Sequence, residues 1–541
     1  MLSSFSYVFF TAMAVLLLWT TPVSGACLTI SPYVMDVTAT GATVRWETND
    51  EVISQMCHRE KFSTAWKLTP SEGMRGAHLR AVTLVDLAAE TRYEYRVIAS
   101  STTSPSVCND HSAISPCEVV RRSLSADLST YFNCQEEFIA RRAEAGDEPW
   151  HLDSEEFEYI NTLPACNESG VTLARNRSAF RRLLRAPSSP HTAVAARRPL
   201  QMQSPNCADL VFEFKTYPII GACGKVFTSW WLGDAGEGTL NQIRVRDAAM
   251  KFLDSDWDAT VALGDNAYPS GTSYQYRTKF FGYYCGQFSK APLYPAMGNH
   301  DFYTSTAYPE LAGPFFDYFV PGLPSRSAYR SSYSFKYARV HVLIADFTSW
   351  KVWTDAGFWT WVENDLRAAR ASSETDWILV GQHFPPYSKG SHDSDTESRL
   401  IRIRERFNLL TDRYGVDLSI TGHSHSYERS HLLQGHRGES STLTAEMILQ
   451  RGTGNNSIFS KSHGCEWSGT VHMVTGSASK TDTAAETTGL SHAAHDIAVI
   501  SHCSVVIRID GSSLVSTCVG ADGVIVDRFT VNSRTCRPSG E

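Results

Sequence analysis

Five glycine-led polar blocks constrain the fold of this chain more than any other feature of its sequence. They are Gly233-Asp234-Ala235-Gly236, Gly264-Asp265-Asn266-Ala267-Tyr268, Gly298-Asn299-His300-Asp301, Gly381-Gln382-His383 and Gly422-His423-Ser424-His425. Four of them follow apolar runs of strand length, at 226–232, 260–263, 377–380 and 416–420, and helical patterns at 240–253, 358–371 and 397–414 intervene. Strands that alternate with helices indicate βαβ units, which bind ligands at the carboxyl ends of their strands. Residues 206–541 therefore predict an α/β domain whose site is built from these blocks.

The residues before this domain differ in kind. Residues 27–118 alternate apolar and polar side chains at 38–47 and 91–98, as β-strands do. Leu87, Thr91 and Tyr93 have the spacing of a tyrosine corner, so the segment resembles a fibronectin type III-like sandwich. In residues 119–205 an acidic block adjoins an arginine-rich one, which predicts a charged insertion or linker.

The five blocks supply a set of metal ligands without any thiolate. They contain aspartates, asparagines, a tyrosine and three histidines in addition to His300. Oxygen and imidazole ligands of this kind suit a hydrolytic centre with a trivalent ion beside a divalent one. The glycines let the backbone turn sharply, so that a short side chain can reach a metal beyond the strand.

The order and content of the blocks resemble the metallophosphoesterases and, within them, the purple acid phosphatases. Tyr268, three residues after Asp265, is the discriminating residue. The resemblance implies a four-layer α/β/β/α sandwich preceded by the fibronectin type III-like domain. It also implies two metal ions bridged by Asp265. Iron(III) would be held by Asp234, Asp265, Tyr268 and His425, and a divalent zinc, manganese or iron by Asp265, Asn299, His383 and His423.

The same resemblance implies an acid phosphatase that hydrolyses small phosphomonoesters through a metal-bound hydroxide. His300 would hydrogen-bond the phosphate, and His392 would protonate the leaving alkoxide. The chain departs from the plant-like members, which have two adjacent histidines where this sequence has His392-Asp393. Lys389 is expected to be an exposed loop lysine. Two alternatives stay open, namely a phosphodiesterase or nucleotide pyrophosphatase on the same scaffold and a non-catalytic phosphatase-like anchor or adhesion protein.

Targeting and cysteine content indicate the secretory pathway. The apolar, uncharged residues 1–26 predict a signal peptide, and no later stretch predicts a membrane span. Thirteen cysteines favour disulfides, with Cys108/Cys117 and Cys503/Cys518 close enough for local bridges and Cys223 and Cys285 expected to be structural. Glycosylation sequons begin at Asn167, Asn176 and Asn455. We expect a protein that is secreted or retained in a lumen such as a vacuole.

Charge and cysteine number also bear on partners. The formal net charge of −8 argues against a general nucleic-acid binder, which would carry a basic surface. The odd number of cysteines leaves either a free thiol or an intermolecular bridge, so a homodimer stays open.

Overall fold

The computed structural model describes residues 28–48, 54–73, 78–99, 211–319, 328–461, 467–483, 486–487 and 489–533. Four predictions lie outside the described residues: the signal peptide at 1–26, the insertion at 119–205, the sequons at Asn167 and Asn176, and the Cys108/Cys117 bridge.

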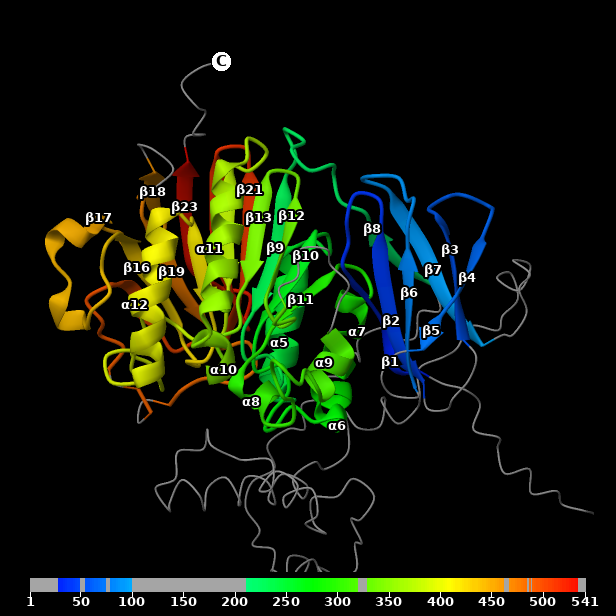
Figure 1. Ribbon diagram of the computed structural model, residues 1–541, viewed down its shortest axis with the longest axis horizontal. Coiled ribbons are helices and arrows are strands. Elements are labelled where there is room, and N and C mark those ends of the chain that lie inside the picture. Colours follow the sequence, from blue (N-terminus) through cyan, green and yellow to red (C-terminus); the bar gives the residue numbers. More distant parts are fainter. Residues whose placement is uncertain are drawn as a thin grey trace, which may run out of the picture.

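The N-terminal domain is a sandwich of two four-stranded sheets at one end of the molecule, drawn in blue except for the green strand β8 (Figure 1). The first sheet has the order β1 (Leu28–Met35), β2 (Ala42–Thr48), β6 (Leu79–Leu84), β5 (Glu72–Gly73). The second has the order β4 (Lys67–Pro70), β3 (Ser54–Glu60), β7 (Arg92–Ala99), β8 (Phe212–Lys215). The predicted tyrosine corner is present, because the backbone N–H of Ala88 donates a 2.8 Å hydrogen bond to the hydroxyl of Tyr93.

Strand β8 belongs to this sandwich although it lies beyond the predicted insertion. It pairs antiparallel with β7, with Phe212 opposite Tyr95, and the ring of Phe214 stacks on that of Tyr93 at 5.6 Å. Residues on both sides of the predicted insertion therefore form one sandwich. The domain boundary that the sequence placed at residue 206 shifts to the end of β8, because strand pairing joins residues that the insertion separates in sequence.

The second domain contains two sheets packed face to face. The first has the order β11 (Leu293–Ala296), β10 (Ala259–Leu263), β9 (Phe227–Leu232), β21 (Cys503–Asp510), β22 (Ser513–Gly520), β23 (Ile525–Ser533), β18 (Ser457–Lys461). The second has the order β12 (Tyr333–Tyr337), β13 (Val340–Ile344), β14 (Trp377–Gly381), β15 (Leu418–Thr421), β19 (Thr470–Thr475), β16 (Tyr427–Leu433), β17 (Ile448–Gln450), with β20 (His495–Val499) also paired to β16.

Helices cover the outer faces of both sheets, as the predicted four-layer α/β/β/α sandwich requires (Figure 1). Helix α5 (Leu240–Phe252) packs on β21 and β22, and α11 (Ala356–Ala371) packs on β13 and β14. The remaining helical segments are α6 (Ser273–Gln275), η2 (Tyr276–Phe281), α7 (Gly282–Phe288), α8 (Asn299–Phe302), α9 (Pro314–Phe319), α10 (Trp350–Trp353), α12 (Ser398–Arg413), η3 (Ser440–Thr442) and η4 (Ala445–Met447). Within the described part of the chain, no helix is both long and apolar enough to cross a membrane.

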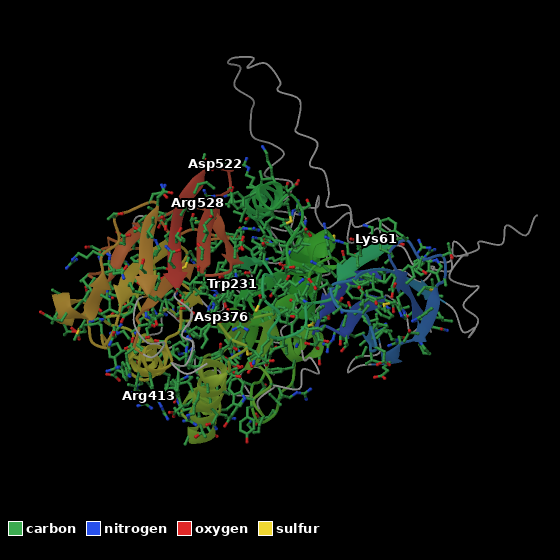
Figure 2. All side chains as sticks on the ribbon, turned by 90° about the horizontal axis from the view of Figure 1, so that it is seen from above. Lys61, Trp231, Asp376, Arg413, Asp522 and Arg528 are labelled. Atoms are coloured by element: carbon green, nitrogen blue, oxygen red, sulfur yellow. A yellow bond between two sulfur atoms is a disulfide. The ribbon has the colours of Figure 1, made fainter. Side chains whose placement is uncertain are left out.

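Strand β9 shows how the layers are filled. Successive side chains of a strand point to opposite faces. Trp231 points between the two sheets toward Gly381, where it lies in the centre of the molecule (Figure 2). Trp230 and Leu232 instead belong to the cluster that includes Val245 of α5. A strand buried on both faces has a continuous apolar sequence, which is why the sequence showed this strand as an apolar run.

The cysteines of the described residues follow the predictions in part. Cys503 and Cys518 form the expected disulfide between β21 and β22. Cys57 and Cys285 each take part in a disulfide as well. Cys223, which was expected to be structural, instead has a free and exposed thiol.

Candidate metal centre

The five blocks meet at one edge of the two facing sheets. Strands β9, β10 and β11 run parallel to one another in the first sheet, and β14 and β15 run parallel in the second. Each block begins within two residues of the end of its strand. The seven predicted metal ligands and His300, which belong to these blocks, are therefore brought to this edge, and His392 reaches it through the contact of its ring with that of His423.

The backbone at this edge is tightly turned. Asp234, Asp265 and His423 have φ values of 57°, 51° and 72°, in the left-handed region that side chains rarely adopt. The close approach of two blocks also requires glycine, since a Cβ on Gly298 would lie 2.1 Å from the backbone nitrogen of Asp265. Local strain of this kind is typical of functional sites.

The first half of the cluster surrounds the phenol of Tyr268. Its hydroxyl lies 2.8 Å from Oδ1 of Asp234, 3.1 Å from Oδ2 of Asp265 and 3.2 Å from Nε2 of His425. Tyr268 is buried, and burial together with the Asp234 carboxylate raises its pKa well above the ordinary value. In this setting the phenol ionises only where a cation compensates the new charge.

The second half of the cluster surrounds His383. Its Nδ1 lies 2.8 Å from the carbonyl oxygen of Leu263, so Nδ1–H donates there and Nε2 faces the centre. That Nε2 lies 3.0 Å from Oδ1 of Asn299 and 3.4 Å from Oδ2 of Asp265. His423 offers a ring nitrogen within 4.8 Å of the ligand atoms of Asp265 and His383. Asp265 contacts both halves, as a bridging ligand would.

This donor set fits metal ions. In a neutral His383, the lone pair of Nε2 would face the oxygens of Asn299 and Asp265, which are also acceptors. This arrangement is unfavourable unless a proton or a cation lies between the nitrogen and the oxygens. Although burial lowers it, the Asp265 carboxylate raises the pKa of His383 to about 9. Hydrogen bonds to Asp234 and Asp482 likewise raise the pKa of His425 to about 9 against the effect of burial. Both imidazoles thus sit where positive charge is favoured, and no cysteine is needed.

The two predicted catalytic histidines flank the cluster. The ring of His300 lies 4.4 Å from that of Tyr268, and its Nδ1 lies 2.5 Å from the carbonyl oxygen of Pro269, which leaves Nε2 toward Asp265 at 3.8 Å. The ring of His392 stacks on His423, with centroids 3.6 Å apart and planes 18° apart.

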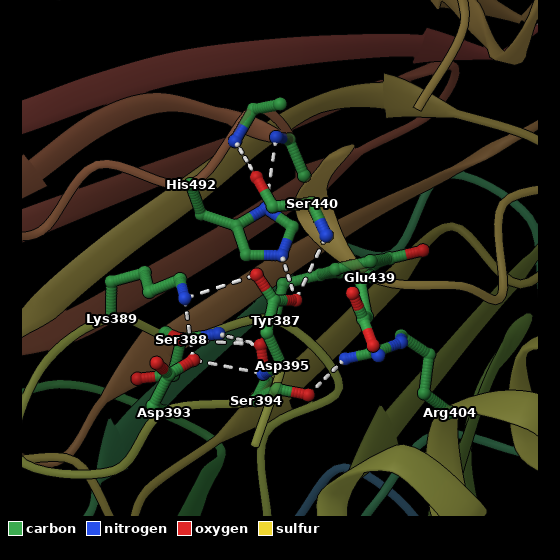
Figure 3. Close-up of polar contacts among 12 residues, drawn as sticks. Tyr387, Ser388, Lys389, Asp393, Ser394, Asp395, Arg404, Glu439, Ser440 and His492 are labelled. Carbon is green, nitrogen blue, oxygen red and sulfur yellow. Dashed lines mark hydrogen bonds and ion pairs between the residues drawn. The ribbon is translucent and has the colours of Figure 1, made fainter. Parts of the chain in front are cut away.

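The loop that carries His392 is fixed by charged groups (Figure 3). Lys389 was expected to be exposed, but its side chain is 13% exposed and its Nζ lies 2.6 Å from Asp393 and 3.0 Å from Asp395. Arg404 of α12 donates to the backbone carbonyl of Ser394 at 2.6 Å. The prediction for Lys389 was wrong because two acidic residues of the same loop pair with it.

Sequence reasoning missed Asp482. This carboxylate lies 3.2 Å from Nδ1 of His425 and accepts a 2.8 Å hydrogen bond from the backbone of Ser391. It therefore links a candidate ligand to the loop that carries His392. Asp482 lies on the chain segment that follows β19 (Thr470–Thr475) but is not adjacent to the strand end, so the contiguous glycine-led pattern did not include it.

Comparisons with known proteins agree with this geometry. Residues 230–427 match the calcineurin-like phosphoesterase family. Purple acid phosphatase 21 of Arabidopsis thaliana is 27% identical over 40% of this chain and 47% of its own length. Fe(3+)-Zn(2+) purple acid phosphatase 12 of the same plant is 31% identical over 25% of this chain and 28% of its own. The chain thus matches less than half the length of each of these two relatives.

The fold has a counterpart among solved structures. Purple acid phosphatase PPD1 from yellow lupin seeds aligns with 94% of this chain and 75% of its own, with a TM-score of 0.61 at 14% identity. That likeness confirms the predicted fold class of a β-rich domain followed by a metallophosphoesterase domain. Residues 230–427 of this chain thus resemble the calcineurin-like phosphoesterases, and the relatives named above are purple acid phosphatases.

Proposed function

We propose that this chain is a secreted acid phosphatase that hydrolyses phosphomonoesters at a dinuclear centre of iron(III) and a divalent metal. One observation carries the proposal most directly. The hydroxyl of Tyr268 converges with Asp234, Asp265 and His425 within 3.2 Å. A buried phenol beside two carboxylates is a poor anion by itself, so this arrangement favours a strongly acidic ion such as iron(III).

In this proposal Asp234, Asp265, Tyr268 and His425 hold the iron, and Asp265, Asn299, His383 and His423 hold the divalent ion. The relative with iron and zinc in its name supports this pair of metals. When bound, the two ions polarise the phosphate and lower the pKa of a water molecule.

Charge explains why a phosphate would bind to an acidic protein. Two ions contribute +5, whereas the two carboxylates, the phenolate and a hydroxide contribute about −4, which leaves a core of about +1. Lys480 adds a cation at the edge of the centre, with its Nζ 5.8 Å from the ring of Tyr268. A phosphate dianion is therefore attracted despite the net charge of −8.

The protein's own groups bind and protonate the substrate. Nε2 of His300 is turned to the centre and hydrogen-bonds a phosphate oxygen. His392 donates a proton from its ring to the oxygen of the departing alcohol, as a general acid does. The disulfide between Cys503 and Cys518 supports an oxidising compartment, in agreement with the predicted signal peptide.

The test combines metal analysis, an absorbance scan and substrate hydrolysis on the purified glycoprotein. We expect about one iron per chain, a visible tyrosinate charge-transfer band, and faster hydrolysis of p-nitrophenyl phosphate than of bis-p-nitrophenyl phosphate at acid pH. A colourless, iron-free protein would overturn the proposed centre. Preference for the diester would assign a phosphodiesterase, and metal without hydrolysis would assign a non-catalytic protein. The same sample on a non-reducing gel and by gel filtration shows whether a disulfide-linked dimer forms.

A further inference from the structure

We propose that Glu397 is a positioning residue that holds His392 with its Nε2 free to protonate the leaving group. The proposal rests on the proposed phosphatase function and adds a residue that the ligand pattern does not contain. It concerns the point at which this sequence has His392-Asp393 instead of two adjacent histidines.

Glu397 contacts Nδ1 of His392. This is the ring nitrogen that must donate a hydrogen bond within the protein if Nε2 is to face the substrate. Oε1 of Glu397 lies 3.0 Å from Nδ1 of His392 and accepts a second hydrogen bond of 3.0 Å from the backbone N–H of Asp393. Glu397 immediately precedes helix α12, and its side chain is 35% exposed. When Nδ1–H donates to this carboxylate, the second nitrogen, Nε2, is the one left for the substrate.

The ring is also fixed in its plane. It stacks on His423, a candidate ligand of the divalent metal, at a centroid separation of 3.6 Å. The backbone N–H of His392 donates to Oγ of Ser424 at 3.2 Å. Stacking sets the plane of the imidazole, and the hydrogen bond to Glu397 selects which edge faces the centre. Two constraints of different kinds thus determine one orientation.

Asp393 does not supply this contact although it is adjacent in sequence. Its Oδ1 lies 2.6 Å from Nζ of Lys389 and 2.8 Å from the backbone nitrogen of Asp395 (Figure 3). The carboxylate of Asp393 is therefore already paired with groups of its own loop. Glu397, which lies just before helix α12, is the carboxylate that reaches the imidazole.

In the proposed reaction, His392 protonates the alcohol oxygen as that oxygen is displaced from phosphorus. A water-derived hydroxide forms a bond to phosphorus while the bond between phosphorus and the alcohol oxygen breaks. The proton on Nε2 of His392 passes to that departing oxygen, and neutral His392 recovers a proton from solvent, which also received the proton of the attacking water. Glu397 keeps its hydrogen bond to Nδ1–H throughout and gains no proton.

The experiment compares two leaving groups in the full-length metal-loaded protein. Glu397→Ala and His392→Ala should each slow hydrolysis of an alkyl phosphate such as glycerol phosphate by about a hundredfold in kcat, because a poor leaving group needs the proton. Hydrolysis of p-nitrophenyl phosphate should fall by less than about threefold, because its phenolate leaves without one. Glu397→Gln keeps an oxygen acceptor and should lie between Glu397→Ala and wild type.

Two controls make the result specific. Thr396→Ala removes only an exposed side chain with a 3.4 Å contact to the carbonyl of Asp393, and it should match wild type on both substrates. The double variant of His392 and Glu397 should be no slower than His392→Ala alone, because Glu397 acts through the imidazole.

Metal content separates this role from ligation. His392, Glu397 and His423 also have ligand atoms within 4.8 Å of one another. If wild type binds a third equivalent of metal that Glu397→Ala loses, Glu397 is a ligand and the positioning role is wrong. An equal loss on both substrates would also overturn it while leaving the phosphatase assignment intact. Wild type without any phosphomonoesterase activity would instead overturn the proposed function and, with it, this inference.

Discussion

Oδ1 of Asp482 lies 3.2 Å from Nδ1 of His425, on the side of the imidazole opposite the candidate metal centre. A carboxylate in this position fixes the orientation of a metal-binding histidine and raises its basicity. Asp482 is buried and also accepts hydrogen bonds from the backbone N–H groups of His425 and Ser391. It joins His425, a candidate metal ligand, to the loop that carries His392, the proposed general acid.

We therefore expect Asp482→Asn to weaken metal binding. Removing such a partner typically costs about 10- to 100-fold in metal affinity. Titration of the metal-free protein with iron and zinc, read by a competing chelator, measures the change. Asp510→Asn, at an exposed position on the far end of β21, is the matched control and should bind as wild type does. Unchanged affinity in Asp482→Asn would show that the contact is structural only.

Tyr268→Phe should remove the colour of the protein while it keeps its fold. The substitution deletes the hydroxyl that lies 2.8 Å from Asp234 and leaves the buried ring in place. Without a phenolate the proposed iron ion would lose one anionic ligand and, with it, the ligand-to-metal charge transfer. An absorbance scan with iron analysis at equal protein concentration checks both effects. A visible band that survives in Tyr268→Phe would contradict the assignment of Tyr268 as an iron ligand.

Much of this site could be predicted from the sequence because each block is local. A glycine, an acceptor or imidazole, and the end of an apolar strand are contiguous, as at Gly264-Asp265, and parallel strands bring such ends together. Asp482 and Glu397 could not be found in this way, since their roles depend on which side of an imidazole they reach. Strand β8 was missed for a related reason, because its pairing with β7 crosses a long interruption of the sequence.

Gly298→Ala should be strongly destabilising, unlike an alanine at Gly286. The new Cβ would lie 2.1 Å from the backbone nitrogen of Asp265. Neither backbone segment can shift to relieve this clash without displacing a candidate metal ligand, Asp265 or Asn299. We expect a loss of more than about 2 kcal/mol in the free energy of unfolding, together with weaker metal binding. Gly286→Ala is the control, since nothing lies within 4 Å of its Cβ in helix α7, and it should gain up to about 1 kcal/mol. Chemical denaturation of both variants gives the comparison, and similar stabilities would contradict it.

Arg277→Ala should loosen the contact between the N-terminal sandwich and the second domain. The guanidinium forms two hydrogen bonds of 2.5 Å and 2.9 Å to the carboxylate of Glu47, whose side chain is only 7% exposed. Loss of the arginine leaves a largely buried carboxylate without this cation, which we expect to cost about 1–2 kcal/mol, because the arginine is partly exposed to solvent. Arg508→Ala, which breaks an exposed pair with Asp510, should cost close to nothing. Thermal unfolding of the two variants tests the difference, and equal shifts would show that this interface pair contributes no more than a surface pair.

His472 should make the fold less stable as the pH falls below 6.5. Burial, aided by the nearby His436, lowers the pKa of this β19 histidine to about 3, below the value of about 6.5 expected in the unfolded chain. The unfolded state therefore takes up the proton first, so the stability that is present above pH 6.5 is lost progressively as the pH falls toward 3. At pH 5 this one group costs about 2 kcal/mol relative to pH 7. His472→Gln cannot titrate, so its unfolding free energy should fall by about that much less than that of wild type between pH 7 and pH 5. Denaturant titrations at the two pH values measure both changes, and an identical fall in the two proteins would show that His472 is not a source of acid sensitivity.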